Sequence, residues 1–433
     1  MTTDYDVIIV GGRPSGSTLA ARLGQRGWRV LLIERARLPA LPGASCPIIY
    51  SSTMRMLDEI GADEAAYARG TPKIRRMVNA GELLKGEIEI PLVEGRDYAY
   101  AIDRARFDFA LWENALRFPT VEGRLGYSLI DLLWEGDRVI GIVGQPAGGE
   151  RETLTARLVI GADGRFSTVA RKAKAAERDE HAEYPTSIYY AYWKYAAPHD
   201  SRGAAAVAWG EGTGFGFLMM DSADDTTLVA VEGKTELLDP APGQAEAMYM
   251  EMVRKFPAVW RRFEHAERIT EVRGMRNIGN LYRQPGGNGW GLVGDAYHQK
   301  DPLDGQGIYD AVYTAKVLAT CIDDYLSGRK LWAQALIDYD RNARAETYPM
   351  YRSTLARVHD SFYPSNPEWF TRFSTQTWAR WIFEDRLVSE QMGLMLTRQI
   401  KPREMLSAPI VIGALLRGPL RDLSRFLDKQ IER

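Results

Sequence analysis

Short apolar runs that end in glycine recur along this chain. Residues 6–10 form such a run before Gly11 and Gly12, residues 17–25 follow with a helical pattern, and residues 29–34 form a second apolar run. This order predicts a βαβ unit. Comparable runs end in glycine at 158–161 and 290–294. Three such returns, far apart in the chain, predict one parallel sheet assembled from separate segments.

The pattern changes between about residue 176 and residue 280. Apolar and aromatic runs at 189–193, 205–209, 214–218 and 227–231 are broken by glycine and aspartate. They predict a second, mostly antiparallel sheet. Most of their aromatic side chains are expected to be ordinary core. After about residue 335 the pattern turns helical.

Composition narrows the class of protein. The 433 residues carry a net charge of -2, so the chain lacks the positive field that nucleic-acid binding needs. Cys46 and Cys321 cannot build a disulfide framework, and neither has metal-ligand spacing. The N-terminus has no signal-peptide pattern, and residues 408–416 are too short an apolar run to cross a bilayer. A cytoplasmic enzyme without a structural metal is expected.

The first glycine-rich turn has the residues of a dinucleotide site. In residues 11–16, Gly11 permits a tight turn and Gly16 allows close helix packing, so that amides at the helix start can hold a pyrophosphate. Arg13 replaces the middle glycine of G-x-G-x-x-G; it either adds charge to phosphate binding or shifts the pyrophosphate outward. Glu34 ends the next strand, where a carboxylate accepts hydrogen bonds from ribose hydroxyls and disfavours a 2′-phosphate. The alternative is a plain glycine-rich turn.

Two later segments and one short motif carry a family resemblance. Residues 161–171 resemble the "DG" motif of group A flavin-dependent monooxygenases, the p-hydroxybenzoate hydroxylase-like family. Residues 294–298, with 302–307 after them, resemble its "GD" motif, and residues 103–108 resemble its arginine motif, which implies that Arg104 lies near the FAD pyrophosphate. The resemblance covers about residues 4–335. It implies a Rossmann-like FAD-binding domain.

The resemblance also implies a reaction. NAD(P)H, bound transiently, reduces FAD, molecular oxygen adds to the reduced flavin, and one oxygen atom passes to an apolar or aromatic small molecule. A geranylgeranyl reductase-like flavoenzyme is the alternative. A non-redox flavoprotein is a further alternative. Flavin-dependent halogenases carry a W-x-W-x-I-P signature and an essential lysine, and residues 214–220 lack that tryptophan pair, which disfavours halogenation.

The expected functional residues follow from these motifs. Asp295 is expected to bind a ribityl hydroxyl, with a helix N-cap as the alternative, and Asp163 either joins the FAD network or only caps a helix. A helix that begins near Gly305 is expected to direct its positive end at the isoalloxazine. The cofactor-binding set is Gly11, Gly12, Arg13, Pro14, Ser15, Gly16, Glu34, Arg35, Arg104, Leu129, Asp163, Gly164, Asp295, Pro302, Gly305, Gln306, Gly307 and Ile308.

Catalytic residues are harder to assign from the pattern. Pro302 resembles the family's proline beside the reactive face of the flavin. His298 is either an acid or base near the flavin or a support for its loop. Cys46 lies in a loop that the family's topology brings toward the flavin edge, and a packed thiol is the alternative.

The expected fold class is α/β with α+β insertions. A discontinuous FAD-binding domain comprises 1–75, 101–175 and 281–335, a mostly antiparallel substrate domain comprises 76–100 and 176–280, and 336–433 is a C-terminal helical region. That region ends in an amphipathic stripe of Leu420, Leu423, Leu427 and Ile431. Its helices pack on the main body, cover the active site, form a homodimer interface, or lie on a membrane surface.

Overall fold

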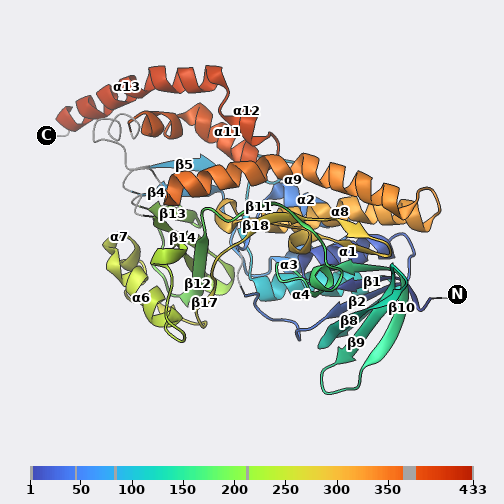
Figure 1. The fold of residues 1–433 in the computed structure, drawn as a ribbon. Helices are drawn as coiled ribbons and strands as arrows, with labels where there is room; N and C mark the ends of the chain where they lie inside the picture. The colour runs from blue at the N-terminus through green and yellow to red at the C-terminus, as the bar shows by residue number, and fades with distance from the viewer. Residues whose placement is uncertain (1–2, 44–45, 82–84, 211–213, 364–376, 432–433) are drawn as a thin grey trace. The chain divides into compact units, whose positions relative to one another are not determined.

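The chain forms two compact units, each built from three segments. The computed structural model describes residues 3–43, 46–81, 85–210, 214–363 and 377–431, with side chains described up to residue 427 (Figure 1). Unit 1 comprises Met1–Arg69, Ile102–Glu183 and Ile278–Tyr351. Unit 2 comprises Gly70–Ala101, Tyr184–Asn277 and Arg352–Arg433.

Unit 1 is built on the predicted parallel sheet. Its strands lie in the order β19-β20-β10-β1-β2-β7, and all neighbouring pairs from β20 to β7 are parallel. In the register, Val10 lies opposite Gly161, and Gly161 opposite Leu292. The three strand–glycine junctions of the sequence therefore meet at one edge of the sheet. The α/β fold class is confirmed.

Helices of unit 1 begin at or near that edge. All residues of α1 are buried, and α1 packs against α8. A β8–β9 arm extends the first part of β10, and β11, β18 and β21 form a small antiparallel sheet. The elements are β1 (Tyr5–Val10), α1 (Pro14–Gly24), β2 (Val30–Glu34), β3 (Ile48–Ile49), α2 (Ser51–Asp58), α3 (Glu64–Tyr67), α4 (Arg104–Leu116), β7 (Val121–Leu125), β8 (Tyr127–Glu135), β9 (Arg138–Pro146), β10 (Glu152–Gly161), α5 (Thr168–Lys172), β11 (Glu177–His181), β18 (Asn280–Arg283), β19 (Gly286–Gly287), β20 (Trp290–Leu292), η3 (Gly294–Ala296), β21 (His298–Gln299), η4 (Pro302–Asp304), α8 (Gly307–Leu326) and α9 (Trp332–Phe362), whose last residues belong to unit 2.

Unit 2 contains the predicted antiparallel sheet. Its strands lie in the order β16-β12-β15-β14-β13-β4-β5, and within this path only β13 and β4 pair in parallel. The elements are β4 (Arg76–Ala80), β5 (Lys85–Glu89), β6 (Tyr100–Ala101), β12 (Thr186–Lys194), β13 (Ala206–Gly210), β14 (Phe215–Asp221), η1 (Ala223–Asp225), β15 (Thr226–Lys234), η2 (Thr235–Leu237), α6 (Ala245–Lys255), α7 (Pro257–Trp260), β16 (Glu267–Arg268) and β17 (Arg273–Met275).

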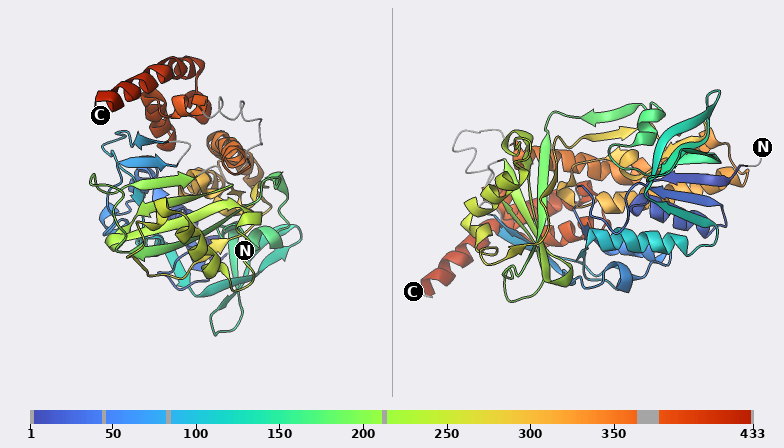
Figure 2. Two further views of the ribbon diagram at one scale, coloured as in Figure 1. Left: turned by 90° about the vertical axis from the view of Figure 1, so that its left-hand side faces the viewer. Right: turned by 90° about the horizontal axis from the view of Figure 1, so that it is seen from below.

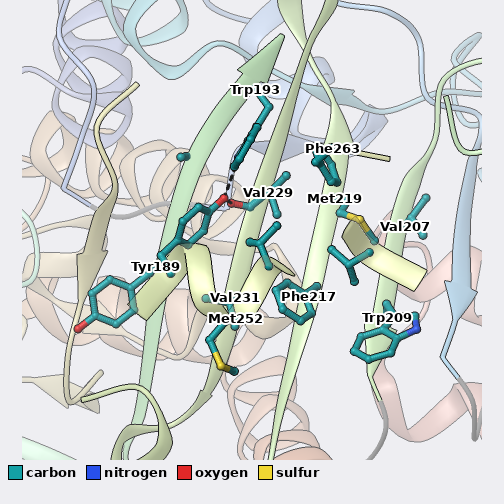
Figure 3. Close-up of a cluster of buried hydrophobic side chains, with 14 of the residues drawn as sticks. Tyr189, Trp193, Val207, Trp209, Phe217, Met219, Val229, Val231, Met252 and Phe263 are labelled. Atoms are coloured by element: carbon teal, nitrogen blue, oxygen red, sulfur yellow. Dashed lines mark hydrogen bonds between the residues drawn. The ribbon is translucent and has the colours of Figure 1, made fainter. Parts of the chain in front are cut away.

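One face of this sheet packs against α6 and α7. Tyr189, Trp193 and Phe217 lie in that core, where Figure 3 shows them with residues of the neighbouring strands. The Trp193 Nε1–H donates a hydrogen bond to the hydroxyl of Tyr249, 3.0 Å away. Since side chains alternate along a strand, Tyr190 and Tyr192 project from the opposite face.

Unit 2 ends in helices, as predicted for the C-terminal region. These are α11 (Arg386–Leu396), α12 (Pro402–Met405) and α13 (Ala408–Ile431), preceded by helical residues 377–383 (Figures 1 and 2). Among the described residues, no helix combines the length and apolarity that a membrane crossing requires.

Candidate functional site

The site is built where the dinucleotide turn meets the end of β10. Gly11 has a φ of +106°, and a Cβ at this position would lie 2.4 Å from the carbonyl oxygen of Ala162. A Cβ at Gly16 would lie 1.8 Å from the carbonyl oxygen of Gly11. Both positions therefore need glycine, as the sequence pattern predicts. The close packing places the start of α1 beside Asp163.

The third junction reaches the same place. Gly294 has a φ of +61°, and a Cβ there would lie 2.7 Å from Ser15 Oγ. The Gly294 amide donates a hydrogen bond to Thr314 Oγ1 on α8, 3.2 Å away. The segments near residues 11, 163 and 295 thus converge at one edge of the sheet.

Glu34 lies at the end of β2 beside the turn. Its Oε2 accepts a hydrogen bond from the Gly12 amide at 2.9 Å, and its Oε1 accepts one from the Ala36 amide at 2.9 Å. The carboxylate is held in place by the backbone, and each oxygen retains a second lone pair for another donor. The geometry fits a carboxylate that orients a ribose.

Arg13, the arginine in the turn, is fixed by an ion pair and a backbone hydrogen bond. Arg13 Nη1 lies 2.6 Å from Asp108 Oδ2 and donates to the carbonyl oxygen of Ala40 at 3.1 Å. Arg104 Nε donates to Asp108 Oδ1 at 3.1 Å. Asp108 is fully buried between the two guanidinium groups, so the cluster of Arg13, Asp108 and Arg104 carries one net positive charge. This charge balance suits a phosphate ligand.

Asp163 accepts backbone hydrogen bonds at the start of α5, whose N-cap residue is Ser167. The Asp163 Oδ2 accepts hydrogen bonds from the amides of Thr168 at 2.6 Å and Val169 at 3.3 Å. Ser167 Oγ donates to Oδ1 at 2.6 Å. Burial raises the pKa of Asp163, although these hydrogen bonds oppose the shift. The carboxylate therefore fixes the DG segment beside Gly11.

Asp295 is tied to the DG segment through Arg165. The Arg165 Nε lies 3.1 Å from Asp295 Oδ2, and its Nη2 donates to the carbonyl oxygen of Lys300. Asp295 does not occupy a helix N-cap position, since Val293 occupies that of η3 and Gln306 that of α8, and neither makes a side-chain capping hydrogen bond. About a third of its side chain is exposed, so it is accessible to a ligand.

The loop before α8 has the shape that a flat ring requires. Pro302 begins η4, and Gly305 follows with a φ of +67°; its missing Cβ would lie 2.6 Å from Ile48 and 3.4 Å from Cys46 Sγ. The helix α8 begins at Gly307, where a Cβ would meet no protein atom within 4 Å. An open cradle at the N-terminus of a helix fits the edge of an aromatic, electron-accepting ring.

A buried ionic cluster supports this loop. Lys300 Nζ lies 2.8 Å from Asp304 Oδ2 and 2.9 Å from Asp310 Oδ2, so it joins the loop to the first turn of α8. His298 stacks on Tyr282 with ring centroids 4.1 Å apart, and its Nε2 lies 3.6 Å from Asp310 Oδ2. Burial lowers the pKa of His298. This inward position favours the loop-supporting interpretation.

The remaining sequence-predicted residues occupy varied places. Arg35 is exposed after β2, and Leu129 is half-buried near the start of β8. Sequence reasoning does not find the ion-pair roles of Asp108, Arg165 and Lys300. Asp108 and Arg165 belong to the arginine and DG motifs, and Lys300 lies between the two segments of the GD motif. The Asp108 signal was present as an i,i+4 pair with Arg104 on α4; the other two depend on contacts that no spacing rule predicts.

The residues present fit FAD. Within the described chain, neither α1 nor α8 has a side-chain cap at its N-terminus. Backbone amides in the first turn of each helix can therefore bind an anion. The net charge near Arg13 suits the pyrophosphate, Glu34 the ribose, and the cradle at Gly307 the isoalloxazine.

Comparison with known proteins agrees with this geometry. Residues 4–347 match the model of the FAD binding domain family. The tryptophan 2-halogenase of Chondromyces crocatus is 25% identical over 99% of this chain and 79% of its own length. The digeranylgeranylglycerophospholipid reductase of Methanosarcina acetivorans is 26% identical over 79% of this chain and 81% of its own length.

Solved structures share the fold. The flavin-dependent brominase Bmp2 superposes with a TM-score of 0.75 at 20% identity, over 97% of this chain and 99% of its own. PqsL, a probable FAD-dependent monooxygenase from Pseudomonas aeruginosa, superposes with a TM-score of 0.66 at 20% identity, over 86% of this chain and 99% of its own. At these identities the likeness establishes the fold alone.

Proposed function

Because the chain belongs to the FAD binding domain family, whose group A flavoenzymes its motifs resemble, we propose that it is an FAD-dependent monooxygenase. It uses NAD(P)H and molecular oxygen to oxygenate an apolar or aromatic small molecule. The observation that carries this proposal is the convergence of Gly11, Asp163 and Gly294 at one edge of the parallel sheet.

In this proposal the protein binds and orients FAD, which supplies the redox chemistry with oxygen. The amides at the start of α1 and the Arg13–Asp108–Arg104 cluster hold the pyrophosphate. Glu34 orients the adenosine ribose, and Asp295 the ribityl chain. The positive end of α8 would stabilise negative charge on the isoalloxazine ring. Burial lowers the pKa of His298, which favours its neutral form.

We assign substrate recognition to the face of the unit 2 sheet that does not pack on α6 and α7. Tyr190 and Tyr192 on β12 and Leu218 and Met220 on β14 project from that face, as strand alternation requires. These side chains are apolar or aromatic with two hydroxyl groups. Tyr190, Tyr192 and Met220 are at most 3% exposed and Leu218 is half-buried, so this face is a closed layer of side chains rather than an open surface. Its chemistry suits an apolar substrate with a few polar groups.

Halogenation is the second candidate, because the likeness to the tryptophan halogenase extends over 99% of the chain, beyond the residues that match the family model. Against it, phenylalanines at 215 and 217 stand where the halogenase signature has tryptophans. Both rings are buried in the core against Phe256. Reduction of an isoprenoid double bond is the third candidate, supported by the reductase relatives.

One set of reactions separates the three. The purified chain, reconstituted with FAD, is screened against aromatic and isoprenoid compounds for accelerated NAD(P)H oxidation, and products are identified by mass spectrometry. We expect a product that gains one oxygen atom, in step with oxygen consumption and without dependence on chloride or bromide. A product that gains a halogen in the presence of halide, or two hydrogens under anaerobic conditions, would replace the proposed function.

A further inference from the structure

The C-terminal helix α13 packs with its charged side inward. Arg417 Nη2 and Arg421 Nη1 lie 2.7 and 2.6 Å from the carboxylate of Asp385, whose side chain is 2% exposed. Two further ion pairs, Arg380–Asp422 and Arg425–Glu384, and a hydrogen bond from Trp381 Nε1 to Asp422 extend the same contact. Gly418 fits against the Trp381 ring, where a Cβ would lie 2.2 Å from the nearest ring atom.

The opposite side of α13 is apolar and exposed. Its large side chains are all more than half exposed: Ile412 57%, Leu416 70%, Leu420 65%, Leu423 56%, Phe426 59% and Leu427 51%. Figures 1 and 2 show α13, in red, alongside α11 at the C-terminal end of the chain. A surface helix ordinarily places its apolar stripe inward, so this reversed arrangement calls for a partner. The predicted stripe member Ile431 lies outside the residues whose side chains are described.

The stripe has a nearly symmetric spacing. Ile412, Leu416, Leu420, Leu423 and Leu427 follow steps of four, four, three and four residues, close to the alternating steps of three and four in a coiled-coil seam. When the stripe is reversed about Leu420, Leu416 falls on Leu423 and Ile412 falls on Leu427. Such a stripe is complementary to a reversed copy of itself.

We propose that α13 is a self-association surface, and that a second copy of this chain packs its own α13 antiparallel on the stripe, with Leu420 near the two-fold axis. A two-fold contact requires this self-complementarity. A membrane surface is a poorer fit, since between residues 408 and 427 every arginine is engaged in an ion pair with Asp385 or Glu384. Interfacial helices instead present basic side chains to anionic lipid.

The size of the stripe is adequate. Six large side chains, each more than half exposed, offer roughly 600 Å² per copy, or about 1,200 Å² for a pair, at the lower end of the range for specific interfaces. Pro409 and Pro419 are also exposed on α13 and add to this area.

Sedimentation velocity of the full-length FAD-loaded chain over a range of concentrations tests the proposal. We expect a dimer for the wild type and a monomer for Leu416→Glu and Leu423→Glu, with unchanged circular dichroism and FAD content. Leu331→Glu is the matched control, because Leu331 is 79% exposed but lies outside α13; it is expected to remain a dimer. A wild type that stays monomeric, or a dimer that survives both substitutions, would overturn the proposal.

Cross-linking tests the antiparallel arrangement. A mixture of Leu416→Cys and Leu423→Cys chains should form a disulfide-linked dimer, because position 416 of one copy lies opposite position 423 of the other. Either variant alone should not, because position 416 or 423 of one copy lies about 10 Å along the helix axis from the same position of the other copy, too far for a disulfide. The wild type controls for Cys46 and Cys321. Efficient cross-linking of either variant alone would contradict the arrangement. If the wild type is a monomer that binds phosphatidylglycerol vesicles, and Leu416→Glu and Leu423→Glu abolish this binding, the stripe is a membrane-binding surface and the proposal is wrong.

Discussion

Replacement of Gly16 by alanine tests the convergence at the dinucleotide turn. The new Cβ would lie 1.8 Å from the carbonyl oxygen of Gly11 and 3.2 Å from Ala162 Cβ. An ordinary carbon–oxygen contact needs more than 3 Å, so two main-chain segments must separate by over about 1 Å. Overpacking of this kind costs about 1–3 kcal/mol. If that cost falls on the FAD-bound geometry, FAD affinity drops roughly 5-fold to 150-fold.

The assay is titration of the apoprotein with FAD, followed by flavin fluorescence, together with urea unfolding of the apoprotein. Gly16→Ala should weaken FAD binding and destabilise the apoprotein, because the overlap is between protein atoms. Gly307→Ala should weaken FAD binding without destabilising the apoprotein, since its Cβ meets no protein atom within 4 Å. Gly86→Ala is the control, because Gly86 lies on β5 of unit 2 and its Cβ would make only an ordinary contact, 3.6 Å from the carbonyl oxygen of Phe383. Unchanged FAD affinity in both site variants would refute the assignment.

Three further predictions concern the charged groups. Lys300→Met should lower the free energy of unfolding by about 3–5 kcal/mol, because the buried carboxylates of Asp304 and Asp310 lose their counter-charge. Urea unfolding measures this change. A loss below about 1 kcal/mol would mean that the cluster is not formed. The arginine partners Arg417 and Arg421 hold the pKa of the Asp385 carboxyl below its usual range. The ionised carboxylate therefore contributes to the free energy of unfolding above the pKa of the unfolded state, and this contribution is lost as pH falls through the lowered pKa of the folded state. The difference in unfolding midpoint between wild type and Asp385→Asn should therefore shrink below about pH 4, and a difference that grows in acid would contradict the sign. Arg13→Gly should retain FAD within about tenfold in affinity, because Asp108 keeps its pair with Arg104, and complete loss of flavin would show that the arginine is essential.

The sequence predicts the site well where a local rule governs it. Gly11 and Gly16 are required by backbone contacts with Ala162 and Gly11 itself, and a strand–glycine–helix pattern is the direct trace of such contacts. Glu34 at the end of the second strand is found by the same rule. The three strand–glycine junctions predict that β1, β10 and β20 share one parallel sheet, but they do not give the strand order.

The supporting ion pairs are beyond such rules. Arg165 meets Asp295 across 130 positions of chain, and Lys300 is buried only because two carboxylates surround it. Residue type alone would place a lysine at the surface. Likewise, the sequence pattern of α13 predicts an apolar stripe but not whether the stripe faces the protein or solvent. The ion pairs of Arg417 and Arg421 with the buried Asp385 place the charged side of the helix inward.

The most direct test of the flavin site is the cofactor content of the purified chain. The account predicts a yellow protein that releases FAD on denaturation, at one FAD per chain, and an apoprotein that takes FAD up again. A colourless preparation that does not bind added FAD would contradict it.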